Sequence, residues 1–276
     1  MSTLKYKNYN INYIVDGDLH SGKEVIIILN GIMMSTLSWE QFKDAFSSNN
    51  VLVRFDMLDQ GESSKVDFNY TQEIQVDILE SLINELKLDN VNLVGISYGA
   101  SIALQYAVKY PSRVNKLIVA NGVAKTSLWL KAIGDGWNQV AQSRDGEAYY
   151  NITIPYIYSP TFYSKNIEWM TNRKKVLVPL FSNPQFLDQI TRLTISAETH
   201  DTTDSLGLIT AQTLIISSEQ DYLTPVFEQE YLQRNINNSK LVVIPNCGHA
   251  SMYEVPHIFT SLVLGFINSD NIPKII

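Results

Sequence analysis

The sequence predicts an α/β protein with one mostly parallel sheet, and three observations support this prediction. Short runs of β-branched residues recur along the chain, as is typical of strands that are buried on both faces. Longer segments with apolar residues every three or four positions separate these runs, which indicates amphipathic helices. The regular alternation of strand and helix favours parallel crossovers with helices on both faces of the sheet. We find no internal repeat.

The first half of the chain supplies most of these elements. A polar-faced hairpin is predicted over residues 4–15. Strands are predicted over residues 25–29, 51–55, 91–94 and 116–120. Two helices lie between them: one has a stripe at Ile74, Ile78, Leu82 and Leu86, and the other has a small-residue face at Ala100, Ala103, Leu104 and Ala107. Pro111 is expected to end the second helix because proline cannot continue the backbone hydrogen bonding.

The pattern breaks after residue 124 and resumes near residue 206. Strands at 213–216 and 241–244 follow, with a helix between them that has Thr224 as its N-cap and Pro225 at its first position. A closing helix is predicted over residues 251–266. Residues 125–205 are too many for a simple loop. The prediction is therefore a core of residues 1–124 and 206–276, with an inserted helical cap or lid at 125–205.

The composition is that of an ordinary globular protein. The chain has 276 residues, 45% of them hydrophobic, and a net charge of −7. The acidic balance argues against nucleic acid or an anionic membrane as a partner, and no apolar run approaches the length of a membrane span. The single cysteine, Cys247, excludes an internal disulfide. Because the N-terminus also lacks an apolar signal region, we expect a cytoplasmic protein.

The most specific motif is Gly95-Ile96-Ser97-Tyr98-Gly99. It lies directly between a predicted strand and a predicted helix, which is the context of a nucleophile elbow. The turn is tight, and glycine at its two ends lets neighbouring backbone approach closely. The sequence therefore predicts Ser97 as a nucleophile above the carboxyl ends of the strands, with a helix N-terminus beneath it.

A serine nucleophile needs a base, and His249 has the best placement of the four histidines. It follows the last predicted strand, so it emerges at the same sheet edge as Ser97. The base in turn needs a carboxylate to hold its tautomer. Asp221 follows the strand at 213–216, and Glu219 is its rival in the same loop. The resulting order of Ser97, Asp221 and His249 is the one found in α/β-hydrolases.

Two backbone amides are predicted to stabilise an oxyanion. One is the amide of Tyr98, directly after the nucleophile. The other is the amide of Ile32, in the loop that follows the strand at 25–29, where Gly31 gives the backbone freedom to turn. Met33 in the same loop is predicted to line an acyl pocket, and the alternative is that it packs in the core. Cys247 is expected to be a buried or site-lining residue, since no elbow surrounds it.

These motifs together resemble the α/β-hydrolase fold family over nearly the whole chain. The resemblance also includes Asn30-Gly31 with Trp39 downstream and Gln60-Gly61-Glu62-Ser63. It implies an eight-stranded, mostly parallel sheet, a Ser-His-Asp triad and a cap over the site. Asn-Gly in place of His-Gly is similar to members that transfer hydroxyacyl chains, such as the enzyme that builds the lipid part of rhamnolipids. Asp56 and Asp59 are interpreted as loop acids before the bend at Gly61.

The predicted cap holds 11 of the 29 aromatic residues and equal numbers of acidic and basic residues. We interpret this as an apolar ligand cavity between cap and core, with Trp129 and Trp137 as candidate substrate contacts. The alternative is that the aromatic residues only anchor a small cap. The basic run 173–175 (Arg-Lys-Lys) either contacts phosphates of coenzyme A or an acidic carrier protein, or is a solvated helix end.

The sequence therefore predicts a serine hydrolase that cleaves a small-molecule ester or thioester of apolar acyl character. No metal and no organic cofactor are implied. Two alternatives remain open: an acyltransferase that passes the acyl group to an alcohol, and a non-catalytic, ligand-binding member of the fold. The fold alone does not separate them because this scaffold hosts many functions.

Overall fold

A computed structural model describes residues 2–269 of the chain. Its centre is an eight-stranded sheet in the order β1-β2-β4-β3-β5-β6-β7-β8. The pairs β1–β2 and β2–β4 are antiparallel and the remaining pairs are parallel, which confirms the predicted mostly parallel sheet. The strands are β1 (Ser2–Tyr6), β2 (Tyr9–Asp16), β3 (Val25–Leu29), β4 (Val51–Phe55), β5 (Val91–Ile96), β6 (Val114–Ala120), β7 (Gln212–Ser218) and β8 (Ser239–Ile244).

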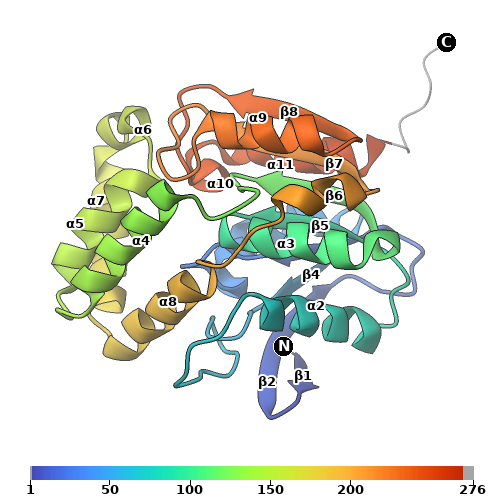
Figure 1. The fold of residues 1–276 in the computed structure, drawn as a ribbon, viewed down its shortest axis with the longest axis horizontal. Coiled ribbons are helices and arrows are strands. Elements are labelled where there is room, and N and C mark those ends of the chain that lie inside the picture. Colours follow the sequence, from blue (N-terminus) through green and yellow to red (C-terminus); the bar gives the residue numbers. More distant parts are fainter. Residues whose placement is uncertain (1, 270–276) are drawn as a thin grey trace.

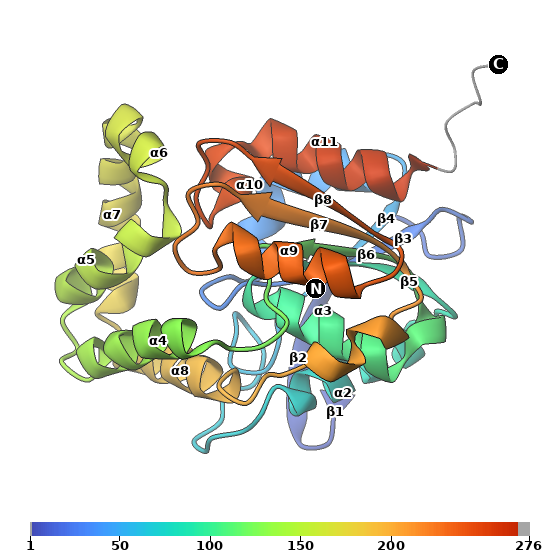
Figure 2. The same cartoon turned by 45° about the horizontal axis from the view of Figure 1, so that its top comes forward.

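Helices cover both faces of this sheet, as predicted. Helices α2 (Glu73–Glu85), α3 (Tyr98–Lys109) and α9 (Val226–Asn235) lie on one face, and α1 (Lys43–Ser47) and α11 (Pro256–Ile267) lie on the other (Figures 1 and 2). Every residue of β3, β4 and β5 is buried, which explains why these central strands are mostly apolar. Short elements complete the core: η1 (Thr36–Phe42), η2 (Pro111–Arg113), η3 (Thr203–Leu208) and α10 (Ser251–Glu254).

The segment between β6 and β7 is helical. It contains α4 (Leu128–Ala141), α5 (Gly146–Ile157), α6 (Pro160–Lys165), α7 (Ile167–Phe181) and α8 (Pro184–Ser196). These helices gather at one side of the molecule, next to the ends of the parallel strands and away from the C-terminal part of α11 (Figure 2). We call residues 125–205 the inserted segment.

Polar contacts join the inserted segment to the sheet domain at several places. The buried carboxylate of Asp59 accepts two hydrogen bonds from Arg192 of α8. The amide of Thr202 donates to the carbonyl of Ala124 at 2.8 Å, where the segment returns to the core. The hydroxyl of Tyr98, in α3, lies 2.8 Å from that of Ser196. The segment is thus held against the part of the core that carries the predicted nucleophile.

Two predicted helix boundaries are wrong, and a proline is involved in both. Helix α9 begins at Val226, with Pro225 as the N-cap, and the Thr224 side chain donates instead to Asp221. The predicted closing helix is broken into α10 and α11 at Val255, which has φ −137° and ψ 59°. Val255 precedes Pro256, and the proline ring disfavours helical backbone in the residue before it.

Within residues 2–269 no helix is both long enough and apolar enough to cross a membrane.

Candidate active site

Ser97 sits at the sharp turn between β5 and α3. Its backbone has φ 53° and ψ −114°, a conformation that is costly for a residue with a side chain. The Ser97 amide donates to the carbonyl of Ala120 at 2.9 Å, which ties the turn to the end of β6. The side chain is only partly buried and lines a cavity. The turn therefore presents a hydroxyl to a cavity from a backbone that the fold holds in place.

The two glycines of the motif are required by close backbone contacts. A Cβ at Gly95 would lie 2.6 Å from the carbonyl oxygen of Gly99, and a Cβ at Gly99 would lie 2.1 Å from that of Leu29. Both distances are far below normal contact. The strand, the turn and the helix consequently pack more tightly than any larger residue would permit.

The structure brings Ser97, His249 and Asp221 together. His249 Nε2 lies 2.7 Å from Ser97 Oγ, and His249 Nδ1 lies 2.7 Å from Asp221 Oδ2. A carboxylate can only accept, so the contact with Asp221 assigns the imidazole proton to Nδ1. Nε2 is then free to accept the proton of the Ser97 hydroxyl.

Asp221, and not Glu219, is the acid that reaches the histidine. Asp221 is buried and accepts hydrogen bonds from the amides of Leu223 and Thr224 at 2.8 and 3.0 Å. Glu219 is exposed, and its carboxylate accepts from the amide of Asn246 at 2.7 Å. The geometry therefore identifies Asp221, and not Glu219, as the acid next to His249, a choice that the sequence left open.

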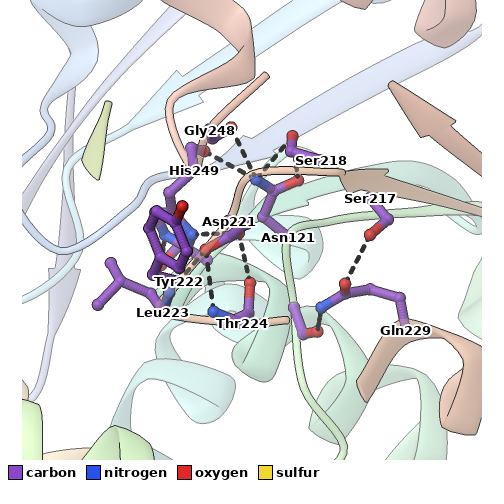
Figure 3. A network of polar contacts seen from close by, with 12 residues as sticks. Asn121, Ser217, Ser218, Asp221, Tyr222, Leu223, Thr224, Gln229, Gly248 and His249 are labelled. Atoms are coloured by element: carbon purple, nitrogen blue, oxygen red, sulfur yellow. Dashed lines mark hydrogen bonds and ion pairs between the residues drawn. The ribbon is translucent and has the colours of Figure 1, made fainter. Parts of the chain in front are cut away.

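Asn121 holds the loop that carries His249. It ends β6 in a left-handed conformation (φ 49°), and its side-chain amide donates to the His249 carbonyl at 2.9 Å and to Ser218 Oγ at 3.1 Å. Figure 3 shows this network between Asn121, the β7 loop and the histidine loop. The sequence gives no signal for these positioning contacts, because the residues that Asn121 meets lie about 100 positions or more away along the chain.

The loop after β3 is held by side chains that the sequence analysis did not assign. Gln60 Nε2 donates to the Gly31 carbonyl at 2.9 Å, and Trp39 Nε1 donates to Asn30 Oδ1 at 2.8 Å. Among the hydrogen bonds of residues 2–269, the amides of Ile32 and Tyr98 have no acceptor. Both residues line the same cavity as Ser97. Two unpaired donors therefore stand beside the serine, as an oxyanion site needs.

The cavity lies between the core and the inserted segment. It is partly open to solvent, and residues of the core and of the inserted segment both line it, as in a site for a small-molecule ligand. Met33 and Trp137 line it, whereas Trp129 does not. Trp129 lies on the surface with 55% of its area exposed, and its Nε1 donates to the carbonyl of Tyr222. The prediction that Trp129 contacts a ligand is therefore not supported by its position at the outer start of α4.

Arg173 also lines this cavity. In the sequence it belongs to the basic run 173–175, which is interpreted either as a contact with phosphates of coenzyme A or an acidic carrier protein, or as a solvated helix end. The spacing along the helix carries a signal for this position: Met170, Arg173 and Leu177 share one face at spacings of three and four, and Met170 and Leu177 are buried. A cation on the apolar face of an amphipathic helix faces the interior.

The remaining candidate residues lie outside the site. Cys247 is buried, and burial raises the pKa of its thiol to about 12, which disfavours the thiolate. His200 is buried against the Val123 carbonyl. Asp56 accepts from Thr36, Asn12 and Glu62, so it is a loop acid, as interpreted. No cluster of three or more His, Cys, Asp or Glu that could hold a metal occurs among the residues that the structure describes.

This fold and this arrangement define a class of protein. Residues 24–256 match the family described as the alpha/beta hydrolase fold, which is most of the chain. The protein therefore belongs to the α/β hydrolase family.

Individual relatives resemble the chain over almost its full length. The crystal structure of MGS-M2, an α/β hydrolase enzyme from a Medee basin deep-sea metagenome library, is 58% identical, with a TM-score of 0.96 and coverage of 100% of this chain and 99% of that one. A putative 2-succinyl-6-hydroxy-2,4-cyclohexadiene-1-carboxylate synthase of Bacillus subtilis is 25% identical over 94% of this chain and 96% of its own. The 3-oxoadipate enol-lactonase 1 of Acinetobacter baylyi is 26% identical over 88% of each chain.

Proposed function

We propose that the protein is a serine hydrolase that cleaves a carboxylic ester or thioester of apolar acyl character through an acyl-enzyme on Ser97. The observation that carries this proposal is the continuous hydrogen-bonded chain from Ser97 through His249 to Asp221, with both links at 2.7 Å. This is the geometry by which a base activates a hydroxyl and a carboxylate orients the base.

In the proposed reaction His249 Nε2 takes the Ser97 proton while Ser97 Oγ attacks the substrate carbonyl. The negative charge that develops on the carbonyl oxygen is stabilised by the amides of Ile32 and Tyr98. His249 then returns the proton to the leaving alcohol or thiol, and Asp221 stabilises the imidazolium in between. Water, activated by the same base, releases the acyl group and restores Ser97.

The inserted segment acts as a cap in this proposal, over a core of residues 1–124 and 206–276. Apolar side chains from both parts line the cavity, among them Met33 and Leu223 from the core and Trp137, Leu177 and Phe181 from the inserted segment. Such a lining favours an apolar acyl chain, because burying it removes its surface from water. We keep Met33 and Trp137 as proposed substrate contacts.

The activity of one relative supports hydrolysis over simple binding. A lactone is a cyclic ester, so the enol-lactonase relative is consistent with ester cleavage. An acyltransferase that uses a coenzyme A or acyl carrier protein thioester would form the same acyl-enzyme and pass it to an alcohol. Product analysis with thioester donors and hydroxyacyl acceptors separates these two outcomes.

A fluorophosphonate probe tests the proposal directly. Wild-type protein should be labelled stoichiometrically and should hydrolyse short to medium 4-nitrophenyl acyl esters. Ser97→Ala should lose both, and His249→Ala should label slowly, whereas His257→Ala, a change at an exposed histidine of α11, should behave as wild type. If the wild-type protein neither reacts with the probe nor hydrolyses these esters, the proposal is wrong and a ligand-binding role is favoured.

A further inference from the structure

Arg173 is separated from the rest of its basic run by the direction its side chain takes. Lys174 pairs with Glu147 at 2.6 Å, and Lys175 is exposed and contacts Asn172. Arg173 instead lines the cavity that also contains Ser97 and His249. Three consecutive cations thus have different surroundings, and one of them reaches the proposed site.

Arg173 differs from every other arginine of the chain in having no carboxylate partner. The other five pair with carboxylates at 4.0 Å or less: Arg54 with Asp16 and Glu40, Arg113 with Glu80, Arg144 with Asp188, Arg192 with Asp59, and Arg234 with Glu230. Within residues 2–269 no carboxylate pairs with Arg173, and its buried Nε has no hydrogen-bond partner.

Aromatic rings hold the guanidinium in place. Its central carbon lies 5.0 Å from the ring centre of Tyr253 and 5.9 Å from that of Trp169. Burial opposes the charge, but the nearby Tyr158 and Tyr253 side chains outweigh burial, so the pKa of Arg173 is raised above its usual value. The group is therefore a fixed positive charge in an apolar cavity. Tyr158 and Tyr253 also interact with the guanidinium through hydrogen bonds, but these contacts supply no carboxylate, and Nε has no hydrogen-bond partner.

Arg173 is partly buried, with its Nε shielded from solvent. A partly buried charge without a counter-ion is unfavourable, and an anionic ligand relieves this cost. The cavity itself provides no such anion. Among the described residues that line it, the one acidic residue is Glu198, which is already paired with Lys131. Apart from the charge that forms on His249 during the reaction, Arg173 is therefore the one cation of the described cavity lining that has no counter-ion.

We propose that Arg173 binds a carboxylate of the substrate, so that the substrate is an ester or thioester with a free carboxylate at the far end of an apolar chain. This inference rests on the proposed function. A carboxylate fits better than a phosphate because it carries one charge and offers two coplanar oxygens to a single guanidinium. A doubly charged phosphate would leave one negative charge unmatched, since Lys131 is already paired.

Matched substrates test this proposal. Each pair has the same chain length and differs only in the terminal group: 4-nitrophenyl hydrogen glutarate against 4-nitrophenyl valerate, and 4-nitrophenyl hydrogen adipate against 4-nitrophenyl hexanoate. A second series places the carboxylate on the alcohol side, with 4-carboxyphenyl butyrate against phenyl butyrate. Wild-type protein should favour the anionic member of at least one series by about tenfold or more in kcat/KM.

The variants separate a binding role from a structural one. Arg173→Gln should lower kcat/KM for the anionic substrate by about 10- to 100-fold, the range of a charge-assisted hydrogen bond, and for the neutral one by less than about threefold. Arg173→Lys should restore part of the preference. Lys175→Gln removes the same charge two residues away, outside the cavity, and should leave both substrates unchanged.

Two results would overturn the proposal: no preference for the anionic member in any series, or equal losses on both members in Arg173→Gln. If Arg173→Gln does not fold, the wild-type comparison decides, together with inhibition of neutral ester hydrolysis by glutarate monoamide against valeramide. If no ester is cleaved at all, the proposed function fails by itself. Calorimetric binding of glutarate monoamide, stronger than that of valeramide, then still supports the site, and its absence rejects it.

Discussion

The guanidinium of Arg192 donates two hydrogen bonds to the carboxylate of Asp59, from Nε at 2.9 Å and from a terminal nitrogen at 2.7 Å. The two residues are 133 positions apart in the sequence and belong to α8 and to the loop after β4. The Asp59 side chain is fully buried and that of Arg192 nearly so. This pair therefore joins the inserted segment to the core close to Tyr98 and the nucleophile turn.

Removing Arg192 should strongly destabilise the protein. Arg192→Met leaves the buried Asp59 carboxylate without its partner, and we expect a loss of about 3–5 kcal/mol in the free energy of unfolding, measured by urea denaturation. Arg144→Met is the matched control, because Arg144 pairs with Asp188 on the surface and should cost less than about 1 kcal/mol. Equal effects of the two changes would contradict the buried role of the Asp59 pair.

Asp221→Asn should lower kcat without preventing substrate binding. The amide preserves the size of the side chain but can donate to His249 Nδ1, which selects the wrong imidazole tautomer. We expect a fall of about 10³- to 10⁴-fold in kcat with a smaller change in KM, measured with the best neutral ester. Glu219→Gln, in the same loop, should change kcat by less than about fivefold. If Glu219→Gln lowered kcat more than Asp221→Asn did, Glu219 would be the functional acid.

Cys247 should react slowly with thiol reagents in the native protein. Its pKa is raised by burial to about 12, so very little thiolate exists at pH 8, and the side chain is also shielded. Labelling with a disulfide reagent should be at least about 100-fold slower than in 6 M guanidinium. Fast native labelling would show that the histidine loop opens.

The same pKa shift predicts how stability depends on pH. A raised folded-state pKa means that the thiol contributes stability fully below its unfolded pKa near 9, and this contribution is lost as pH rises toward about 12. Between pH 9 and 11, unfolding free energy should therefore fall more steeply in the wild type than in Cys247→Ala. Parallel slopes in urea titrations would argue against this prediction.

Trp137 and Trp129 should respond differently to substitution. Trp137 is buried, lines the cavity and has an Nε1 without a hydrogen-bond partner, whereas Trp129 lies outside. Trp137→Phe should enlarge the cavity and shift the preferred acyl chain toward longer esters, with a change of several-fold in relative kcat/KM. Trp129→Phe should leave the chain-length profile unchanged. If only Trp129→Phe changed the chain-length profile, the acyl pocket would lie next to Trp129 and not at Trp137.

Much of the site could be predicted because it is encoded close to the strand ends. In a parallel sheet the carboxyl ends of the strands meet at one edge, so residues directly after β5, β7 and β8 must come near one another. Ser97, Asp221 and His249 occupy these positions, and the glycines around Ser97 show the tight turn in the sequence itself. The choice between Asp221 and Glu219 required the geometry of the loop.

The sequence by itself determined the alternation of strands and helices along the chain and the edge of the sheet at which the site forms, because periodicity and turn residues act over a few positions. Only the tertiary structure decided that Asp59 pairs with Arg192, that Trp137 and not Trp129 reaches the cavity, and that Arg173 faces inward while Lys174 and Lys175 do not. These outcomes depend on which helix face packs against a distant part of the chain. Such packing is set by the sum of many long-range contacts, and no local pattern records it.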